Sequence, residues 1–135
     1  MQKPADALPG HTLQPRLRVF HGSEVIIGAG KIMLLKMIAE TGSISEAARR
    51  MRISYNHAWR LLRGMNASFK NPLIEKTRGG ASGGGANVTD AGKKVLSLYE
   101  DMVASCHAAT RRQWASLKGL LKKSESGPAA GGDAS

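Results

Sequence analysis

Residues 43–69 read SISEAARRMRISYNHAWRLLRGMNASF, and this stretch decides the fold. Ser43 followed three residues later by Glu46 is a capping box, in which each side chain satisfies a free N–H of a helix's first turn. Ser54 is a second N-cap candidate about a dozen residues further on. The pattern predicts two helices, Ile44–Met51 and from Ser54 to about Phe69, joined by a tight turn. This is a helix-turn-helix.

The second helix has the character of a recognition helix. Its outward side is expected to carry polar and basic groups near the N-terminal end, the end that enters the major groove. Asn pairs with adenine and Arg with guanine, while Ser and Tyr hydroxyls suit phosphates. The predicted DNA contacts are Ser54, Tyr55, Asn56, His57, Arg60 and Arg63. His57 equally fits an ordinary surface position, and Trp59, between the faces, is interpreted as a packing anchor rather than a base contact.

The first helix and the turn are expected to support this contact. Small residues, Ala47 and Ala48, let the next helix cross closely, and Ile53 plugs the core after the turn. The predicted DNA contacts here are Ser43, Ser45, Arg49 and Arg52. Arg52 occupies a turn position where glycine is common, which predicts a strained or altered turn. The inner stripe of the second helix is predicted as Ala58, Leu61 or Leu62, Met65 and Phe69.

A glycine-rich segment follows the predicted recognition helix. Residues 73–78 and 86–89 read as short strands, and residues 79–85 (GGASGGG) as the tip between them. Such a wing lets backbone N–H groups approach phosphates closely. A nucleotide-binding loop is the competing interpretation, but neither the P-loop ending nor the G-x-G-x-x-G context is present. The predicted wing contacts are Lys76, Arg78, Gly79, Gly80, Gly83, Gly84 and Gly85.

The N-terminal third reads as a tail, a hairpin and a helix. Residues 1–15 have Pro and Gly without apolar periodicity, which predicts a disordered tail. Residues 17–20 and 24–27 are short apolar runs around His21-Gly22-Ser23, a β-hairpin pattern. Residues 31–41 have helical apolar spacing, with Gly42 as the C-cap.

The C-terminal third reads as one long helix from about residue 90 to 122, started by Thr89-Asp90. A helix of that length cannot bury its whole apolar stripe on so small a domain, which favours pairing with a second copy. The predicted dimerisation residues are Val95, Tyr99 (or Leu98), Met102, Cys106 and Ala109. Folding back on its own domain is the alternative. Residues 16–123 are thus expected to form one domain, and residues 124–135 a second disordered tail.

Composition points to a polyanionic partner. The 135 residues carry a formal net charge of +10, and residues 49–94 hold ten Lys and Arg against two acids. Cys106 is the single cysteine, which argues against a disulfide framework and fits a reducing compartment. No signal-peptide pattern or membrane-spanning run is seen, so we expect no membrane partner and a cytoplasmic, nucleoid-associated protein.

The titratable residues suggest no chemistry. His11, His21, His57 and His107 are scattered over different predicted elements. No metal-ligand spacing and no paired carboxylates are present, so no metal, cofactor or catalytic residue is predicted and an enzyme is not expected.

Several segments together resemble a known family. These are S-I-S-x-A-A, I-S-Y-x-x-A-W, the Met65-Asn66 pair, and G-G-x-x-G-G-G-A-x-V-T-x-x-G from Gly79 to Gly92. Residues 17–109 resemble the N-terminal DNA-binding domain of the ModE family of molybdate-responsive regulators and, more remotely, LysR-type DNA-binding domains. The resemblance implies a mainly α fold with small β elements, a winged helix-turn-helix dimer on a palindromic operator. We expect no counterpart of the family's C-terminal molybdate-binding domains, so molybdate sensing is not implied.

The predicted function is therefore a homodimeric, sequence-specific regulator bound to double-stranded DNA, with a possible role in molybdate or oxyanion homeostasis. Two alternatives remain open. The chain could be a small winged-helix module that pairs or competes with a full-length regulator. It could also sense a small oxyanion at the dimer interface, with basic groups such as Arg111 and Arg112 as ligands.

Overall fold

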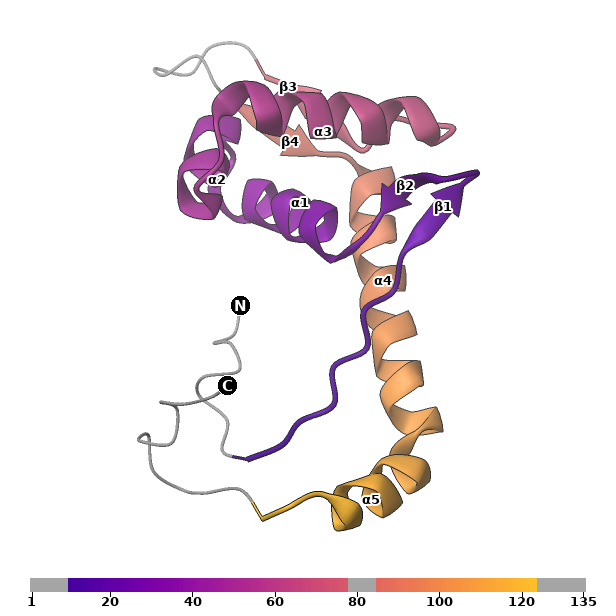
Figure 1. Ribbon diagram of the computed structural model, residues 1–135. Coiled ribbons are helices and arrows are strands. Elements are labelled where there is room, and N and C mark those ends of the chain that lie inside the picture. The colour runs from indigo at the N-terminus through magenta and orange to yellow at the C-terminus, as the bar shows by residue number, and fades with distance from the viewer. Residues whose placement is uncertain (1–9, 78–84, 124–135) are drawn as a thin grey trace. The chain divides into compact units, whose positions relative to one another are not determined.

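The computed structural model describes residues 10–77 and 85–123, which fall into two compact parts: residues 16–103, and residues 10–15 with 104–123. The elements are mostly helical, with two small antiparallel hairpins, as predicted (Figure 1). The helices are α1 (Ala29–Thr41), α2 (Ile44–Met51), α3 (Tyr55–Ser68), α4 (Asp90–Ala109) and α5 (Arg111–Leu120). The strands are β1 (Val19–His21), β2 (Glu24–Ile27), β3 (Ile74–Lys76) and β4 (Ala86–Val88).

The core of residues 16–103 lies among α1, α2 and α3. Helix α1 contributes most to it, because its apolar residues cover much of its circumference and four of them are buried. Fully burying one aliphatic side chain stabilises a fold by about 1.5–3 kcal/mol. The core residues are Ile27, Ile32, Leu34, Leu35, Ile38, Ile44, Ala47, Ala48, Ala58, Leu62, Met65, Leu73, Ile74, Ala86, Val88 and Tyr99.

The corner between α1 and α2 connects the helices to the second hairpin. Gly42 ends α1 with φ 71° and donates its N–H to the Ile38 carbonyl (2.8 Å), which confirms the predicted C-cap. The Gly42 carbonyl in turn accepts the N–H of Ala86 in β4 (3.0 Å). Helix α1 begins at Ala29, two residues before the predicted start, because the Gly28 carbonyl already accepts the Ile32 N–H.

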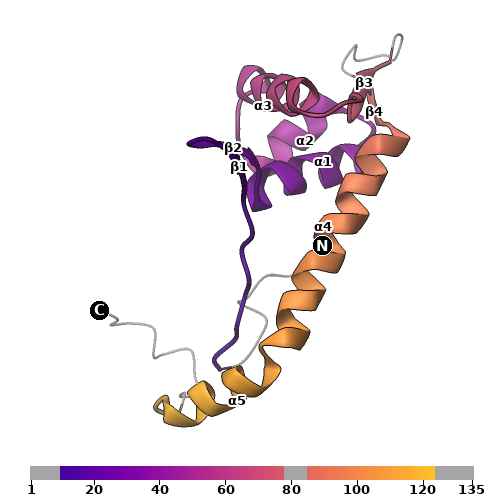
Figure 2. The same cartoon turned by 90° about the vertical axis from the view of Figure 1, so that its right-hand side faces the viewer.

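Two hairpins lie on either side of α3 (Figure 2). Strand β1 pairs with β2 through His21↔Glu24, and β3 pairs with β4 through Ile74↔Val88. The first strand lies at Val19–His21 rather than at residues 17–20. The turn uses only Gly22 and Ser23, so His21 joins the strand.

The Thr89–Gly92 corner fixes the start of α4. Thr89 donates its N–H to the Leu73 carbonyl (2.9 Å) and its hydroxyl to the Pro72 carbonyl (2.7 Å). The same hydroxyl oxygen accepts the Gly92 N–H (3.1 Å), so the predicted cap is confirmed. A Cβ at Gly92 would collide with the Leu73 carbonyl oxygen, which is why this position needs glycine.

The prediction of one continuous helix over residues 90–122 is wrong. Helix α4 ends at Ala109 and α5 begins at Arg111. Thr110 between them has φ −104° and ψ 7°, and both its hydroxyl (2.7 Å) and its N–H (3.1 Å) donate to the Cys106 carbonyl. Back-bonding of a threonine hydroxyl to the preceding turn bends and weakens helices.

The structure describes only part of the two predicted tails. Residues 1–9 and 124–135 lie outside the described residues, and residues 10–15 form neither helix nor strand. Within the described ranges, no helix combines the length and apolar character needed to cross a membrane.

Candidate nucleic-acid interface

Both predicted N-caps of the helix-turn-helix are present, but the reciprocal half of the predicted capping box is wrong. The Ser43 N–H donates to the Thr41 hydroxyl oxygen (3.2 Å), and the Glu46 carboxylate binds Arg49 and Arg50 instead. The Ser43 hydroxyl oxygen accepts the Glu46 N–H (3.0 Å), and the Ser54 hydroxyl oxygen accepts the His57 N–H (3.0 Å). Each cap stabilises its helix by about 1 kcal/mol. These hydroxyl oxygens are therefore already used to start α2 and α3, and a DNA contact by either serine stays a prediction.

The turn between α2 and α3 is built on Arg52. Its φ of 60° is the only positive value at a non-glycine residue in the described ranges. The Arg52 N–H donates to the Arg49 carbonyl (3.1 Å) and the Ile53 N–H to the Ala48 carbonyl (3.0 Å), the pair of bonds that defines a Schellman motif. A left-handed arginine costs about 1 kcal/mol, so the strain predicted at this turn is present. The turn points the exposed Arg52 outward and packs the half-buried Ile53 against the core.

Helix α3 presents a continuous polar and cationic face. Its buried positions are Ala58, Leu62 and Met65, so Leu62 rather than Leu61 is the core residue. Phe69 ends the helix and is only half-buried. The predicted recognition residues are all exposed, namely Ser54, Tyr55, Asn56, His57, Arg60 and Arg63. Tyr55, however, lies about 60° around the helix from Ala58, on the same side as Trp59, and not on the face opposite the core. Asn56, Arg60, Arg63 and Ala67 repeat at spacings of three or four and form the centre of this face.

The arginines of α2 are held by one carboxylate. Arg49 binds Glu46 through Nη2 (2.6 Å) and Nε (3.2 Å), and Arg50 binds it through Nε (3.0 Å). These hydrogen bonds, first from Arg49 and then from Arg50, lower the pKa of Glu46. Arg49 therefore carries a counter-ion, whereas Ser45 and Arg52 are simply exposed.

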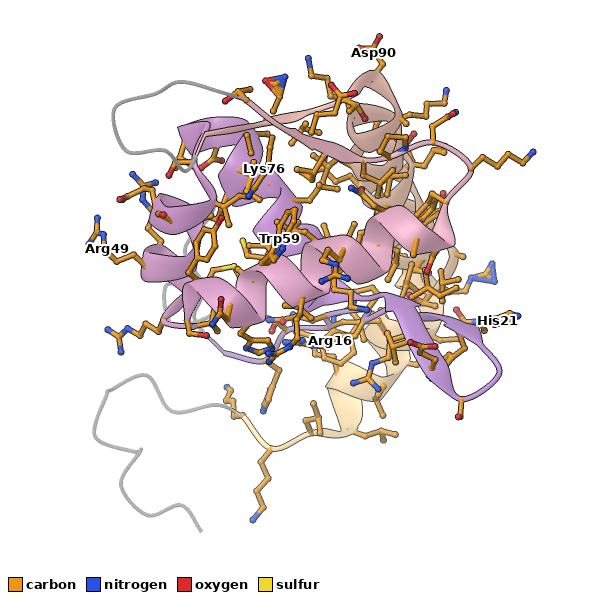
Figure 3. The ribbon with its side chains drawn as sticks, turned by 90° about the horizontal axis from the view of Figure 1, so that it is seen from above. Arg16, His21, Arg49, Trp59, Lys76 and Asp90 are labelled. Carbon is orange, nitrogen blue, oxygen red and sulfur yellow. The ribbon has the colours of Figure 1, made fainter. Side chains whose placement is uncertain are left out.

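One side of α3 is joined to β3 by specific contacts. The Lys76 ammonium lies 4.5 Å from the ring centroid of Trp59 (Figure 3), a cation–π contact. The Asn66 amide oxygen accepts the N–H groups of Leu73 (2.8 Å) and Ile74 (3.2 Å), and its Nδ2 donates to the Ile74 carbonyl (3.1 Å). The role of Asn66 was missed by the sequence-based predictions, although the Met65-Asn66 pair is part of the resemblance.

The predicted wing is described only at its base. Gly85 forms a β-bridge with Ser43, and its carbonyl accepts the Thr77 N–H (3.0 Å). The wing is thereby joined to the start of α2. The other predicted wing contacts, Arg78, Gly79, Gly80, Gly83 and Gly84, lie outside the described residues.

The predicted dimerisation residues of α4 differ in exposure. Tyr99 is 9% exposed and donates its hydroxyl to the Leu17 carbonyl (3.0 Å), so its side chain is used within its own chain. The alternative, Leu98, is 48% exposed, and Met102 is 46% exposed. Val95 and Cys106 are half-buried and Ala109 is exposed. We therefore replace Tyr99 by Leu98 in the predicted dimer surface.

The remaining titratable groups are dispersed. Within residues 10–77 and 85–123, no three His, Cys, Asp or Glu residues lie close enough together to hold a metal ion. Arg111 and Arg112, suggested above as oxyanion ligands, are exposed at the start of α5.

Comparisons with known proteins agree with this architecture. Residues 30–93 match the family model of the bacterial regulatory helix-turn-helix proteins of the lysR family. The transcriptional regulator ModE of Yersinia pestis is 43% identical over 70 residues, which cover 52% of this chain and 27% of that protein. The molybdenum-pterin-binding protein MopB of Rhodobacter capsulatus is 42% identical over 73 residues, covering 54% and 27%.

A solved structure shares the fold. The DNA-binding domain of CbnR in its crystal structure with DNA superposes with a TM-score of 0.51 at 20% identity, covering 65% of this chain and 95% of that one. The curated relatives are matched over about a quarter of their own length, so the similarity concerns one region of each. Residues 30–93 of this chain are thus similar to the helix-turn-helix domain of LysR-family regulators and to the matched region of ModE regulators.

Proposed function

We propose that this chain is a sequence-specific transcriptional regulator that binds a palindromic operator as a homodimer. The observation that carries the proposal is the exposed face of α3, on which Asn56, Arg60 and Arg63 stand on a rigid, doubly capped helix-turn-helix. Arg and Asn side chains distinguish guanine and adenine in the major groove. On α2, Glu46 pairs with the exposed Arg49 and Arg50, and a DNA phosphate that reaches this helix can compete for them.

The stripe on α4 supports the homodimer. Leu98, Met102, Cys106 and Ala109 repeat at helical spacing, and the first two expose about half of their apolar side chains. A second copy that covers this stripe would bury it, and a dimer on a palindromic operator needs its two recognition helices about one DNA turn, roughly 34 Å, apart.

The similarity to ModE suggests which genes are regulated. Because the matched relatives are named as ModE regulators and molybdenum-pterin-binding proteins, we propose that the operator lies near genes for molybdate or oxyanion homeostasis. Whether an oxyanion acts on this chain directly is a separate question, tested by calorimetry with molybdate, tungstate and sulfate.

DNA recognition is tested by fluorescence anisotropy on promoter fragments and on scrambled duplexes. Arg60→Ala should weaken binding to the preferred fragment by about 1–3 kcal/mol and relax the preference at one base position. Lys118→Ala, which removes one positive charge in α5 outside the matched segment, is the control and should not change the preference. Equal affinity of the wild type for all duplexes would contradict sequence-specific binding.

The dimer is tested by sedimentation velocity. Met102→Glu should shift the protein from dimer to monomer, because it places a charge in the apolar stripe. Ala104→Glu, on the opposite side of α4, is exposed and should leave the dimer intact. A wild-type protein that sediments as a monomer at micromolar concentration would rule out the stable homodimer.

A further inference from the structure

The side of α3 that faces away from the wing also carries a cluster of positive charge. A cleft opens there between the segment before β1, the start of α1, and α3. Three cationic side chains, Arg16, Arg18 and Lys31, line it together with His57 of α3. The sequence-based predictions included His57 only; the three cations lie outside the helix-turn-helix motif.

The side chains that line this cleft suit an anion. Arg16 and Arg18 are exposed, and no carboxylate is among the residues that line the cleft. The Lys31 ammonium donates to the Val25 carbonyl (2.7 Å), which holds it in place and uses one of its three N–H groups. The acid of the adjacent hairpin, Glu24, pairs in register with His21 beside the turn and does not line the cleft.

The cleft and the wing contacts lie on opposite sides of α3. In Figure 3, which looks onto α3, Trp59 and Lys76 lie along one side of the helix and Arg16 lies along the other. The helix itself shows the same division. His57 and Leu61, four residues apart, line the cleft, whereas Trp59 and Asn66 contact β3. The outer face with Asn56, Arg60 and Arg63 lies between these two sides.

A helix in the major groove lies between two phosphate backbones about 12 Å apart. Cations on one side of the helix can reach only the nearer strand, so a second group is required for the other strand. On the wing side of α3, Lys76 is the cation that can reach one strand. Arg16 and Arg18 of the second group lie before the matched segment 30–93, whereas Lys31 and His57 lie within it.

We propose that the cleft formed by Arg16, Arg18, Lys31 and His57 binds a backbone phosphate of the DNA strand on the side of α3 opposite the wing. The proposal rests on the proposed function, because it adds a contact to the same DNA complex. The chemistry recognised is a phosphate group, and its source is either the DNA backbone or a free anion. The experiment separates these two sources.

The test compares two double variants of equal charge by fluorescence anisotropy on a mixed-sequence duplex between 50 and 200 mM salt. Arg16→Ala with Arg18→Ala removes two cations from the cleft, and Lys118→Ala with Lys122→Ala removes two from the region of α5. Both pairs are exposed, and melting curves check that both variants fold. Each lost phosphate contact should reduce affinity roughly tenfold at 0.1 M salt and lower the slope of log K against log salt by about one.

The proposal predicts a large loss of affinity and a shallower slope for the Arg16/Arg18 variant only, with the same loss on every duplex. Equal behaviour of the two variants would overturn it while leaving DNA binding intact. Failure of the wild type to bind any duplex would instead overturn the proposed function. Calorimetry with inorganic phosphate is the second arm. Binding of free phosphate that is lost in the Arg16/Arg18 variant, with unchanged DNA affinity, would make the cleft a small-anion site and contradict the proposal.

Discussion

The two sides of α3 are built in different ways. On the wing side, Asn66 makes three hydrogen bonds to β3, and Lys76 is held over Trp59. On the opposite side, the exposed Arg16 and Arg18 line a cleft together with apolar residues such as Val25, Met51 and Leu61. The first side is fixed by directional contacts, whereas the second depends on charge and packing. Substitutions on the wing side should therefore change stability, and substitutions at Arg16 and Arg18 should change DNA affinity alone.

The largest effect should come from Gly92→Ala, which disturbs the base of the wing side. A methyl group there would collide with the Leu73 carbonyl oxygen and contact a Val88 methyl group 2.6 Å away. We expect a loss of about 3 kcal/mol in the free energy of unfolding, since neither β3 nor α4 can move away easily. Urea denaturation measures it. Gly64→Ala in α3 is the matched control, because nothing lies within 4 Å of its Cβ and alanine favours a helix; a similar loss in both variants would refute this steric explanation.

Asn66→Ala should have the next largest effect on stability. It removes the partners of two N–H groups and one carbonyl at Leu73 and Ile74, which are buried, and we expect a loss of about 2 kcal/mol. Asn87→Ala, at an exposed position of β4, should change stability by less than about 0.5 kcal/mol. Both are measured by chemical denaturation, and amide exchange at Leu73 and Ile74 should rise in the Asn66 variant alone. Unchanged exchange would mean that Asn66 does not hold β3.

A smaller effect is expected for the contact between Lys76 and Trp59. A double-mutant cycle with Lys76→Met and Trp59→Leu should give a coupling energy of about 0.5–1 kcal/mol in stability. Methionine keeps most of the apolar stem of Lys76, so the cycle isolates the charge on the ring. The same cycle with Lys70→Met in place of Lys76→Met should give a coupling near zero, and equal couplings would show that Lys76 has no specific contact with the ring.

The smallest effect is the pH dependence contributed by Glu46. Hydrogen bonds from Arg49 and Arg50 lower the pKa of this carboxyl in the folded protein below its ordinary value of 4.5. Its contribution to stability is therefore present above about pH 4.5 and is lost as the pH falls through the folded pKa. Because the carboxyl is exposed, solvent screening keeps the effect small. Denaturation of the wild type and of Glu46→Gln from pH 3 to 7 should show a stability difference that shrinks toward acid pH; a difference that grows would reverse the sign.

Local signals were the most reliable part of the sequence. Ser43, Ser54 and Gly42 each act within one turn of their own helix, so the bounds of α2 and α3 and the end of α1 were predicted closely. The end of α4 was missed because the break at Thr110 depends on a single side-chain bond to the Cys106 carbonyl, which apolar periodicity does not register. The choice between Leu61 and Leu62, and between Tyr99 and Leu98, also stayed open, because adjacent residues on a helix differ only in which neighbour they meet.

The sequence by itself determined the helix-turn-helix, its N-caps, an unusual turn at Arg52 and its excess of positive charge, because these depend on composition and on residues a few positions apart. Only the tertiary structure decided that Asn66 holds β3, that Tyr99 is used within its own chain, and that Arg16 lies beside α3 opposite Lys76. These relations join different secondary-structure elements, whether the residues lie eight positions apart, as Asn66 and Ile74 do, or 82, as Tyr99 and Leu17 do. They follow from how the three helices pack, and no spacing in the sequence records that packing.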